Sequence, residues 1–229
     1  MRGDLPFRVR QTTDLEKWRA DTFWTKEPET IAWIESFKDG DTLLDVGANI
    51  GLYSLYAAKL GHQTVAVEPH PSNFTALTMN TRQLNRSLPV RAVYACVGHC
   101  SQMTDFQYDA HDAGTTGGGY TRMMPISVPI YCYTVDELMG LYCGPYDHIK
   151  VDVDGEEREI VLGMRESLGK QVFKSCLIEV EPKHRDFVIG QFTVNGYSSI
   201  SPFNAMTPHS RTRRAREGIK VENIVFTRF

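Results

Sequence analysis

Five short, continuous apolar runs occur along the chain and alternate with stretches in which apolar residues return at helical spacing. The runs are TLLDV (42–46), TVAVE (64–68), VRAVYACV (90–97), HIKVDV (148–153) and KSCLIEVE (174–181). Because their apolar residues are consecutive, we expect strands that are buried on both faces. The helical stretches are GLYSLYAAKLG (51–61), PSNFTALTMNTRQLN (71–85) and GEEREIVLGMRESLG (155–169). This alternation predicts an α/β fold, with a mostly parallel sheet and helices on both faces.

The segments outside this alternation predict a cap, an insertion and a closing region. TKEPETIAWIESF (25–37) predicts a helix, and we interpret residues 1–38 as a cap on a core formed by 39–229. QYDAHDAGTTGGGYTRMM (107–124) is too rich in glycine for regular structure. The remaining expectations are an extended run in ISVPIYCY, a short capped helix at 134–138, a loop after 181, a candidate strand near 195–200 and a final strand at 223–229.

Composition narrows the class of protein. With 229 residues, 41% of them hydrophobic, the chain can fill one core, so we expect a single domain. The net charge of −3 gives no global reason to bind nucleic acid or an acidic membrane surface. The five cysteines form no C-x-x-C pair, and no apolar run approaches the roughly 18 residues that membrane insertion needs. We therefore expect a cytoplasmic protein.

The stretch DVGANIG (45–51) follows the first predicted strand directly, where open α/β sheets bind their ligands. A dinucleotide fingerprint starting at Gly47 would need glycine at the positions of Asn49 and Leu52. A phosphate-binding P-loop would need a G-K-[ST] sequence, which does not follow. Gly47 and Gly51 therefore predict a tight turn whose backbone approaches a ligand that has no diphosphate.

Two acidic residues at strand ends complete this pattern. Glu68 ends the second strand, where a carboxylate can accept hydrogen bonds from two ribose hydroxyls, although it could also cap a helix ahead of Pro69. A ribose without a diphosphate indicates S-adenosyl-L-methionine (SAM). Asp45 ends an apolar strand, and burying it is costly unless it is paired. We expect it to orient the loop amides or the ammonium group of the ligand, with helix capping as the alternative.

Several stretches together resemble the FkbM family of SAM-dependent methyltransferases, from about Thr25 onwards. They are KEPETIAWIESFKDGDTLLDVGANIGLYSLYAAK, VAVEPHPSNF, TVDEL, IKVDVDGEEREIVLGM and NIVFTRF. The resemblance implies a class I (Rossmann-like) methyltransferase fold, with seven strands of which the last is antiparallel, and methyl transfer to a hydroxyl of a sugar or other small molecule. It implies cofactor contacts at Gly47, Asn49, Gly51, Glu68 and Pro69, with Val97 and Gly98 beside the adenine.

Candidate catalytic residues lie at the exit of the fourth strand. Asp152 and Asp154 are two positions apart, so they point to one face while the strand persists. Two neighbouring carboxylates raise the pKa of one of them, which suits a general base. Asp154 could instead cap the next helix. His111, in the glycine-rich insertion, is an alternative base or a solvated side chain.

Two further features allow more than one interpretation. Glu179 and Glu181 could join the two aspartates around Mg²⁺, a metal that we consider possible but do not favour. HSRTRRAREGIK (209–220) could bind an anionic acceptor, although a solvated basic loop is favoured. No aromatic residues lie between its charges, as nucleic-acid binding would require.

The leading hypothesis is a SAM-dependent O-methyltransferase that acts on a glycan or another small-molecule hydroxyl. A nicotinamide-dependent oxidoreductase on a similar sheet is the alternative enzyme, and its missing glycines argue against it. The third hypothesis is a methyltransferase-like binding module without activity. The sequence leaves the acceptor, the oligomeric state and the role of the first 24 residues open, because acceptor walls are built from irregular loops.

Overall fold

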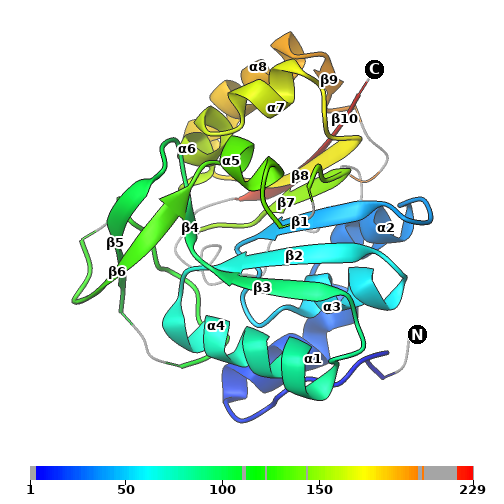
Figure 1. Ribbon diagram of the computed structural model, residues 1–229, viewed down its shortest axis with the longest axis vertical. Helices are drawn as coiled ribbons and strands as arrows, with labels where there is room; N and C mark the ends of the chain where they lie inside the picture. The colour runs from blue at the N-terminus through cyan, green and yellow to red at the C-terminus, as the bar shows by residue number, and fades with distance from the viewer. Residues whose placement is uncertain are drawn as a thin grey trace.

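The computed structural model describes residues 4–109, 112–121, 123–142, 144–200, 203 and 221–228. Its main feature is a seven-stranded sheet with helices on both faces (Figure 1). In spatial order the strands are β3 (Val90–Tyr94), β2 (Gln63–Glu68), β1 (Thr42–Val46), β7 (His148–Val151), β8 (Ser175–Val180), β10 (Glu222–Arg228) and β9 (Tyr197–Ser198). The first five are parallel, and β10 is antiparallel to both of its neighbours. This confirms the predicted class I arrangement.

Each face of the sheet packs against its own group of helices. One face carries α1 (Asp14–Lys26), α2 (Pro28–Glu35), α3 (Leu52–Lys59) and α4 (Pro71–Thr78), which continues as the π-helical η1 (Met79–Leu84). The other face carries α5 (Val135–Met139), α6 (Glu157–Leu162), α7 (Arg165–Gly169) and α8 (Arg185–Val194), with η2 (Pro182–His184) before α8. Neighbouring residues of β1 point to opposite faces of the sheet. Leu43 packs against the first group of helices, and Leu44 packs against the second. This two-sided burial explains the continuous apolar runs.

A second, smaller sheet lies beyond the carboxyl ends of β1, β2 and β3 (Figure 1). It contains β4 (Cys96–Val97), β5 (Gln102–Tyr108) and β6 (Ile126–Tyr133) in the order β4-β6-β5. The prediction of one strand over 90–97 was therefore wrong. The chain leaves the main sheet after Tyr94, and β4 pairs in parallel with β6 around a separate apolar cluster that includes Phe106 and Ile130.

Three helical predictions also need correction. No helix was expected over α1, and a loop was expected where α8 lies. The single helix predicted over 155–169 is broken between α6 and α7. A side chain at Gly163 would overlap the carbonyl oxygen of Gly98, so this close backbone approach requires glycine where the helix is interrupted.

A buried polar network lies at the opposite side of the sheet, at the amino-terminal ends of β7 and β8. His148 Nδ1 lies 2.8 Å from Ser175 Oγ, and His148 Nε2 lies 2.9 Å from Asp41 Oδ2. Trp33 Nε1 donates to the same serine hydroxyl at 2.8 Å. The three side chains have the residue types of a hydrolytic triad. However, the serine is 6% exposed and already bonded on two sides, so we assign this network to stability.

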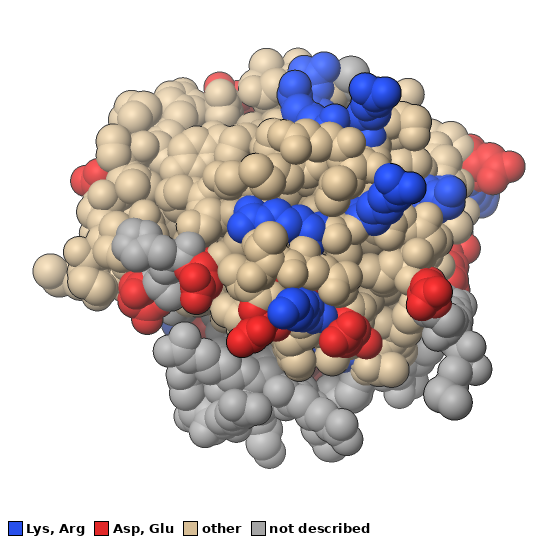
Figure 2. Space-filling view, turned by 90° about the horizontal axis from the view of Figure 1, so that it is seen from below, with Lys and Arg blue, Asp and Glu red and all other residues tan. Residues whose placement is uncertain are grey.

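The outer surface carries charges of both signs. Figure 2 looks at the underside of the molecule, over α1 and α4, where several Lys and Arg side chains are separated by uncharged residues and Asp and Glu side chains flank one of them. In the described part of the chain, no helix is both long enough and apolar enough to cross a membrane.

Candidate active site

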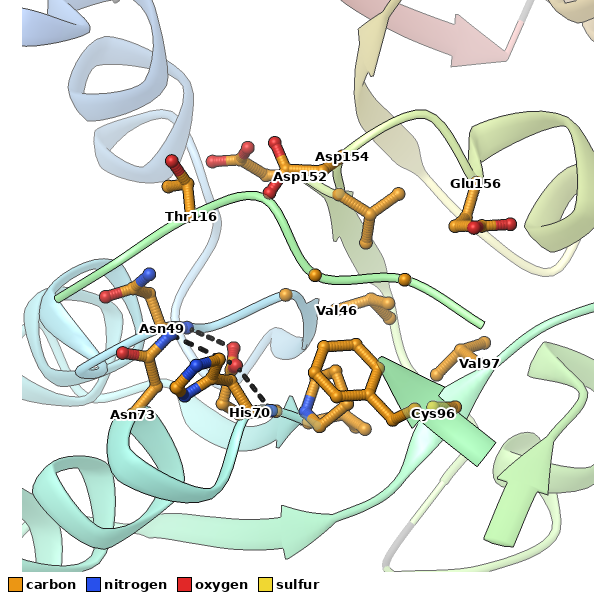
Figure 3. A pocket seen from close by; sticks show the side chains of 18 of the residues that line it. Val46, Asn49, His70, Asn73, Cys96, Val97, Thr116, Asp152, Asp154 and Glu156 are labelled. Atoms are coloured by element: carbon orange, nitrogen blue, oxygen red, sulfur yellow. Dashed lines mark hydrogen bonds between the residues drawn. The ribbon is translucent and has the colours of Figure 1, made fainter. Parts of the chain in front are cut away.

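A cavity lies at the carboxyl ends of β1, β2 and β7 (Figure 3). The strand order changes direction between β1 and β7, which is where open α/β sheets form ligand crevices. Its walls include Gly47, Asn49, Glu68, Pro69, Asn73, Val97, Phe106, Tyr120, Asp152, Asp154 and Glu179, with Arg19 and Lys26 from α1 and residues 115–119 of the glycine-rich segment. The structure thus brings together side chains from distant parts of the sequence.

The Glu68 carboxylate is held firmly inside this cavity. It accepts hydrogen bonds from the backbone N–H of Asn49 at 2.8 Å and of His70 at 2.9 Å, and from Asn73 Nδ2 at 3.3 Å (Figure 3). Only 4% of Glu68 is exposed, and this burial raises the pKa of its carboxyl group to about 7, although the hydrogen bonds oppose the shift. Glu68 is therefore an oriented acceptor whose charge depends on pH near neutrality.

The glycine turn brings β1 and β7 together. Gly47 has φ = +80°, and a side chain there would overlap the carbonyl oxygen of Asp152. The Gly47 and Ala48 amides both donate to Val67 O, at 2.9 and 3.1 Å. Gly51, with φ = +88°, is the N-cap of α3 and lies against Leu77 rather than in the cavity wall.

Asp45 and Gly98 do not line the cavity. Asp45 is 1% exposed beneath the turn and accepts a hydrogen bond from Ser54 Oγ of α3 at 2.5 Å, so its described contact is with the helix. Gly98 lies behind the wall, and its missing side chain leaves room for the Tyr120 hydroxyl. His111 lies outside the described residues.

Lys150 is the main feature that the sequence analysis missed. Its ammonium group lies 2.7 Å from Asp152 Oδ2 and 5.0 Å from the centre of the Tyr53 ring, with 1% of the residue exposed. Burial alone would raise the pKa of Asp152, but the Lys150 charge holds it well below its ordinary value. Asp152 therefore does not have the raised pKa that was expected for one of the two aspartates. The signal was a lysine two positions before Asp152 on one strand face.

The other acidic residues do not gather around a metal. Asp154 accepts a hydrogen bond from the Gly117 amide, and Glu181 pairs with Lys183 at 2.9 Å. Across the described ranges, no three His, Cys, Asp or Glu side chains come close enough together to hold a metal ion. The four-carboxylate magnesium site considered from the sequence is thus not assembled by these side chains.

The glycine-rich segment crosses the cavity and is held from several sides. Gly114 N donates to Asn73 Oδ1 at 2.8 Å, and Thr115 O accepts from Asn49 Nδ2 at 2.8 Å. From α1, Arg19 Nε donates to Gly114 O at 2.7 Å. In Figure 3 the segment passes between Asn49 and Asn73 on one side and Asp152 and Asp154 on the other. It therefore covers the crevice between the two groups of site residues.

Comparisons with known proteins agree with this geometry. The family model described as Methyltransferase FkbM domain matches residues 45–207. The hexuronic acid methyltransferase AglP of Haloferax volcanii is 28% identical over 181 residues, which cover 77% of this chain and 72% of that protein. The matched family region begins at the glycine turn and leaves out α1 and α2.

Solved structures share the fold. Methyltransferase FkbM from Methylobacillus flagellatus KT has a TM-score of 0.53 at 14% identity, over 95% of this chain and 56% of that longer chain. Magnesium protoporphyrin IX methyltransferase from Synechocystis PCC 6803, solved with bound SAM, has a TM-score of 0.53 at 11% identity, over 97% and 87%. These similarities indicate a class I methyltransferase fold.

Proposed function

The chain belongs to the FkbM methyltransferase domain family, and on that premise we propose that it transfers the methyl group of SAM to an oxygen atom of a carbohydrate. The observation that carries the proposal is the cavity in which the glycine turn meets the buried Glu68 carboxylate. The relative that is named for hexuronic acids favours an acidic sugar as the acceptor.

The described residues fit SAM in two respects. Glu68 is fixed at the end of β2, where its carboxylate can accept hydrogen bonds from ribose hydroxyls. Phe106 and Val97 give the cavity an apolar wall beyond Glu68, which suits a flat adenine ring. Together they support a nucleoside position along the exits of β2 and β4.

When bound, SAM supplies a sulfonium whose methyl carbon bonds to the acceptor oxygen as the carbon–sulfur bond breaks, leaving S-adenosylhomocysteine. The chain's contribution is mainly to hold that oxygen in line, and such positioning can be worth about 7–11 kcal/mol. Asp152 is a weak proton acceptor because Lys150 lowers its pKa. We therefore assign Asp152 to orienting a bound group by hydrogen bonding rather than to removing a proton.

The type of acceptor oxygen follows from this assignment. A uronic acid carboxylate is already ionised at neutral pH and needs no general base, whereas a sugar hydroxyl must lose its proton during transfer. A site that holds Asp152 as a weak base suits the carboxylate better. The product distinguishes the two cases, because mild alkali cleaves a methyl ester and leaves a methyl ether intact.

Thermal-shift titration tests the proposal first. SAM and S-adenosylhomocysteine should raise the unfolding temperature and NAD should not, since a ligand that binds only the folded state stabilises it. Incubation with SAM and uronic acid-containing glycans should then add the mass of one methyl group. Stabilisation by NAD alone would favour the oxidoreductase alternative. SAM binding without product across a broad glycan panel would favour the binding module.

A further inference from the structure

We propose that Arg19 and Lys26 of α1 form a subsite that binds a carboxylate group of a small molecule in the cavity. The inference rests on the proposed function, because the molecules concerned are the cofactor and its acceptor. It assigns a binding role to a helix that lies outside the matched family region, residues 45–207.

Both cations occupy one side of α1 and face the site. They are seven positions apart, which is about two helical turns, so they lie on the same helix face. Both line the main cavity together with Gly47, Asn49 and Asp152. Both also line a smaller adjoining cavity, together with Tyr53 and Lys150. The pair therefore borders the end of the site where β1 and β7 meet.

Arg19 retains hydrogen-bonding capacity for a ligand. Its Nε donates to Gly114 O at 2.7 Å, which orients the guanidinium group. Among the residues that the structure describes, no carboxylate lies within salt-bridge distance of Arg19. A guanidinium has five N–H donors in a planar fork that matches a carboxylate. Its terminal N–H groups are thus suited to bind a carboxylate that a ligand brings.

Arg19 and Lys26 are not ion-pair partners of the described carboxylates inside the cavity. Asp152 has the Lys150 ammonium 2.7 Å away, whereas Lys26 and Arg19 stabilise its charge from beyond salt-bridge distance. Lys26 pairs with its neighbour Glu27, which leaves Arg19 as the principal cation of the subsite. The buried Phe23 lies between them on the inward face of α1, so the two cations stand on the face of the helix that packs towards the cavity.

Two molecules in this reaction can supply the carboxylate. One source is the amino-acid end of SAM, which would extend from the ribose at Glu68 towards Gly47 and Asn49. The other is the uronic acid of the acceptor. Both are planar carboxylates that an arginine binds with two parallel hydrogen bonds. The experiment must therefore separate the two sources.

The first arm compares two nucleosides by calorimetry. S-adenosylhomocysteine carries the amino-acid carboxylate, and 5′-methylthioadenosine lacks it. If the cofactor is the source, Arg19→Gln should weaken S-adenosylhomocysteine binding about 10- to 100-fold and leave 5′-methylthioadenosine binding unchanged. Arg19→Lys should keep part of the affinity because it keeps the charge. Lys17→Gln is the matched control, since Lys17 is on the exposed face of the same helix.

The second arm uses protein saturated with S-adenosylhomocysteine and measures binding of glucuronic acid and glucose by ligand-observed NMR. If the acceptor is the source, Arg19→Gln should lose glucuronic acid binding selectively and bind both nucleosides normally. The subsite is overturned if Arg19→Gln changes the affinities for S-adenosylhomocysteine and 5′-methylthioadenosine equally and those for glucuronic acid and glucose equally. It is also overturned if none of these affinities changes. A wild-type protein that binds no S-adenosylhomocysteine would instead refute the proposed function, and the subsite with it.

Discussion

Lys150 and Asp152 form an ion pair that is unusual for its burial. Their charged atoms lie 2.7 Å apart, with 1% of the lysine side chain and 27% of the aspartate side chain exposed. Removing one partner of a buried pair leaves a charge without compensation, whereas replacing both can be nearly neutral. The effects of single and double substitutions should therefore differ strongly at this site.

We expect Asp152→Asn to lower the free energy of unfolding by about 3 kcal/mol, since it leaves the Lys150 ammonium buried and unpaired. The combined change with Lys150→Met should recover most of that loss while methyl transfer stays impaired. Urea unfolding at pH 7 measures both variants. Equal stability of the single and double variants would contradict the assignment of a coupled pair.

We expect Glu68 to make nucleoside binding depend on pH. Burial raises its pKa to about 7, and in our proposal the ionised form accepts hydrogen bonds from the ribose hydroxyls. Affinity for S-adenosylhomocysteine should level off above about pH 8 and fall as the carboxylate is protonated below it, about tenfold between pH 8 and pH 6. Calorimetry at several pH values measures this.

Glu68→Gln is the control for that pH dependence. The variant should bind more weakly at pH 8, by about 1–3 kcal/mol, because a charged acceptor is lost. Its affinity should no longer change between pH 6 and pH 8. If the variant retains the same pH dependence, the titrating group is not Glu68.

The elements differ in how clearly the sequence indicates them. The prediction for β1 agrees with the structure over 42–46, because a strand buried on both faces leaves a continuous apolar run. The helix α1 was missed because its inward face carries Glu16 and Arg19 beside the apolar Phe23, which hides the helical period. Its start did leave a local signal, since Thr13 and Glu16 form a capping box. Polar residues on the inward face of a helix thus obscure the pattern from which helices are predicted.

We predict that the glycine-rich segment acts as a lid over the cavity. Gly114 N and Gly117 N donate to Asn73 and Asp154, so both amides depend on contacts across the cavity. Bound S-adenosylhomocysteine should slow hydrogen exchange in residues 112–121, because lids exclude water from a filled site. Asn73→Ala should raise exchange in the ligand-free protein. Equal exchange with and without ligand would contradict a lid.

Across the whole molecule, the two ends of the parallel strands differ in role. The carboxyl ends of the strands border the candidate site, while a hydrogen-bonded network of Asp41, His148 and Ser175 lies at their amino ends. Burial alone would raise the pKa of Asp41, but hydrogen bonds from Lys174 and His148 lower it to about 2. Asp41 therefore stabilises the fold at neutral pH from the strand ends opposite the site.

Asp41→Asn should lower the free energy of unfolding by about 2 kcal/mol at pH 7. The wild-type advantage is fully present above the ordinary pKa of an aspartate, near 4, and is lost as the pH falls towards 2. Urea unfolding of both proteins at pH 7 and pH 3 measures the difference. Affinity for S-adenosylhomocysteine at pH 7 should stay unchanged, and a loss there would show that the two ends of the strands are coupled.

At this scale, the sequence indicated the fold better than the site. Gly47 and Glu68 line the cavity because they stand at the carboxyl ends of neighbouring strands, which the order of the sheet brings to the crevice. Arg19 reaches the same cavity only through tertiary packing of α1, so no local pattern identifies it. Lys150 is intermediate, since its spacing from Asp152 was visible but its partner was not assigned.

The position of β10 has a consequence for synthesis of the protein. This strand is inserted between β8 and β9, although it follows both in the chain. The ribosome therefore releases β8 with an open hydrogen-bonding edge, which remains open until residues 222–228 emerge. Nascent chains arrested before residue 222 should be cleaved rapidly by proteases, and chains extended beyond 228 should resist. Completion of the sheet, and with it a stable site, thus waits until β10 emerges after both of its neighbours.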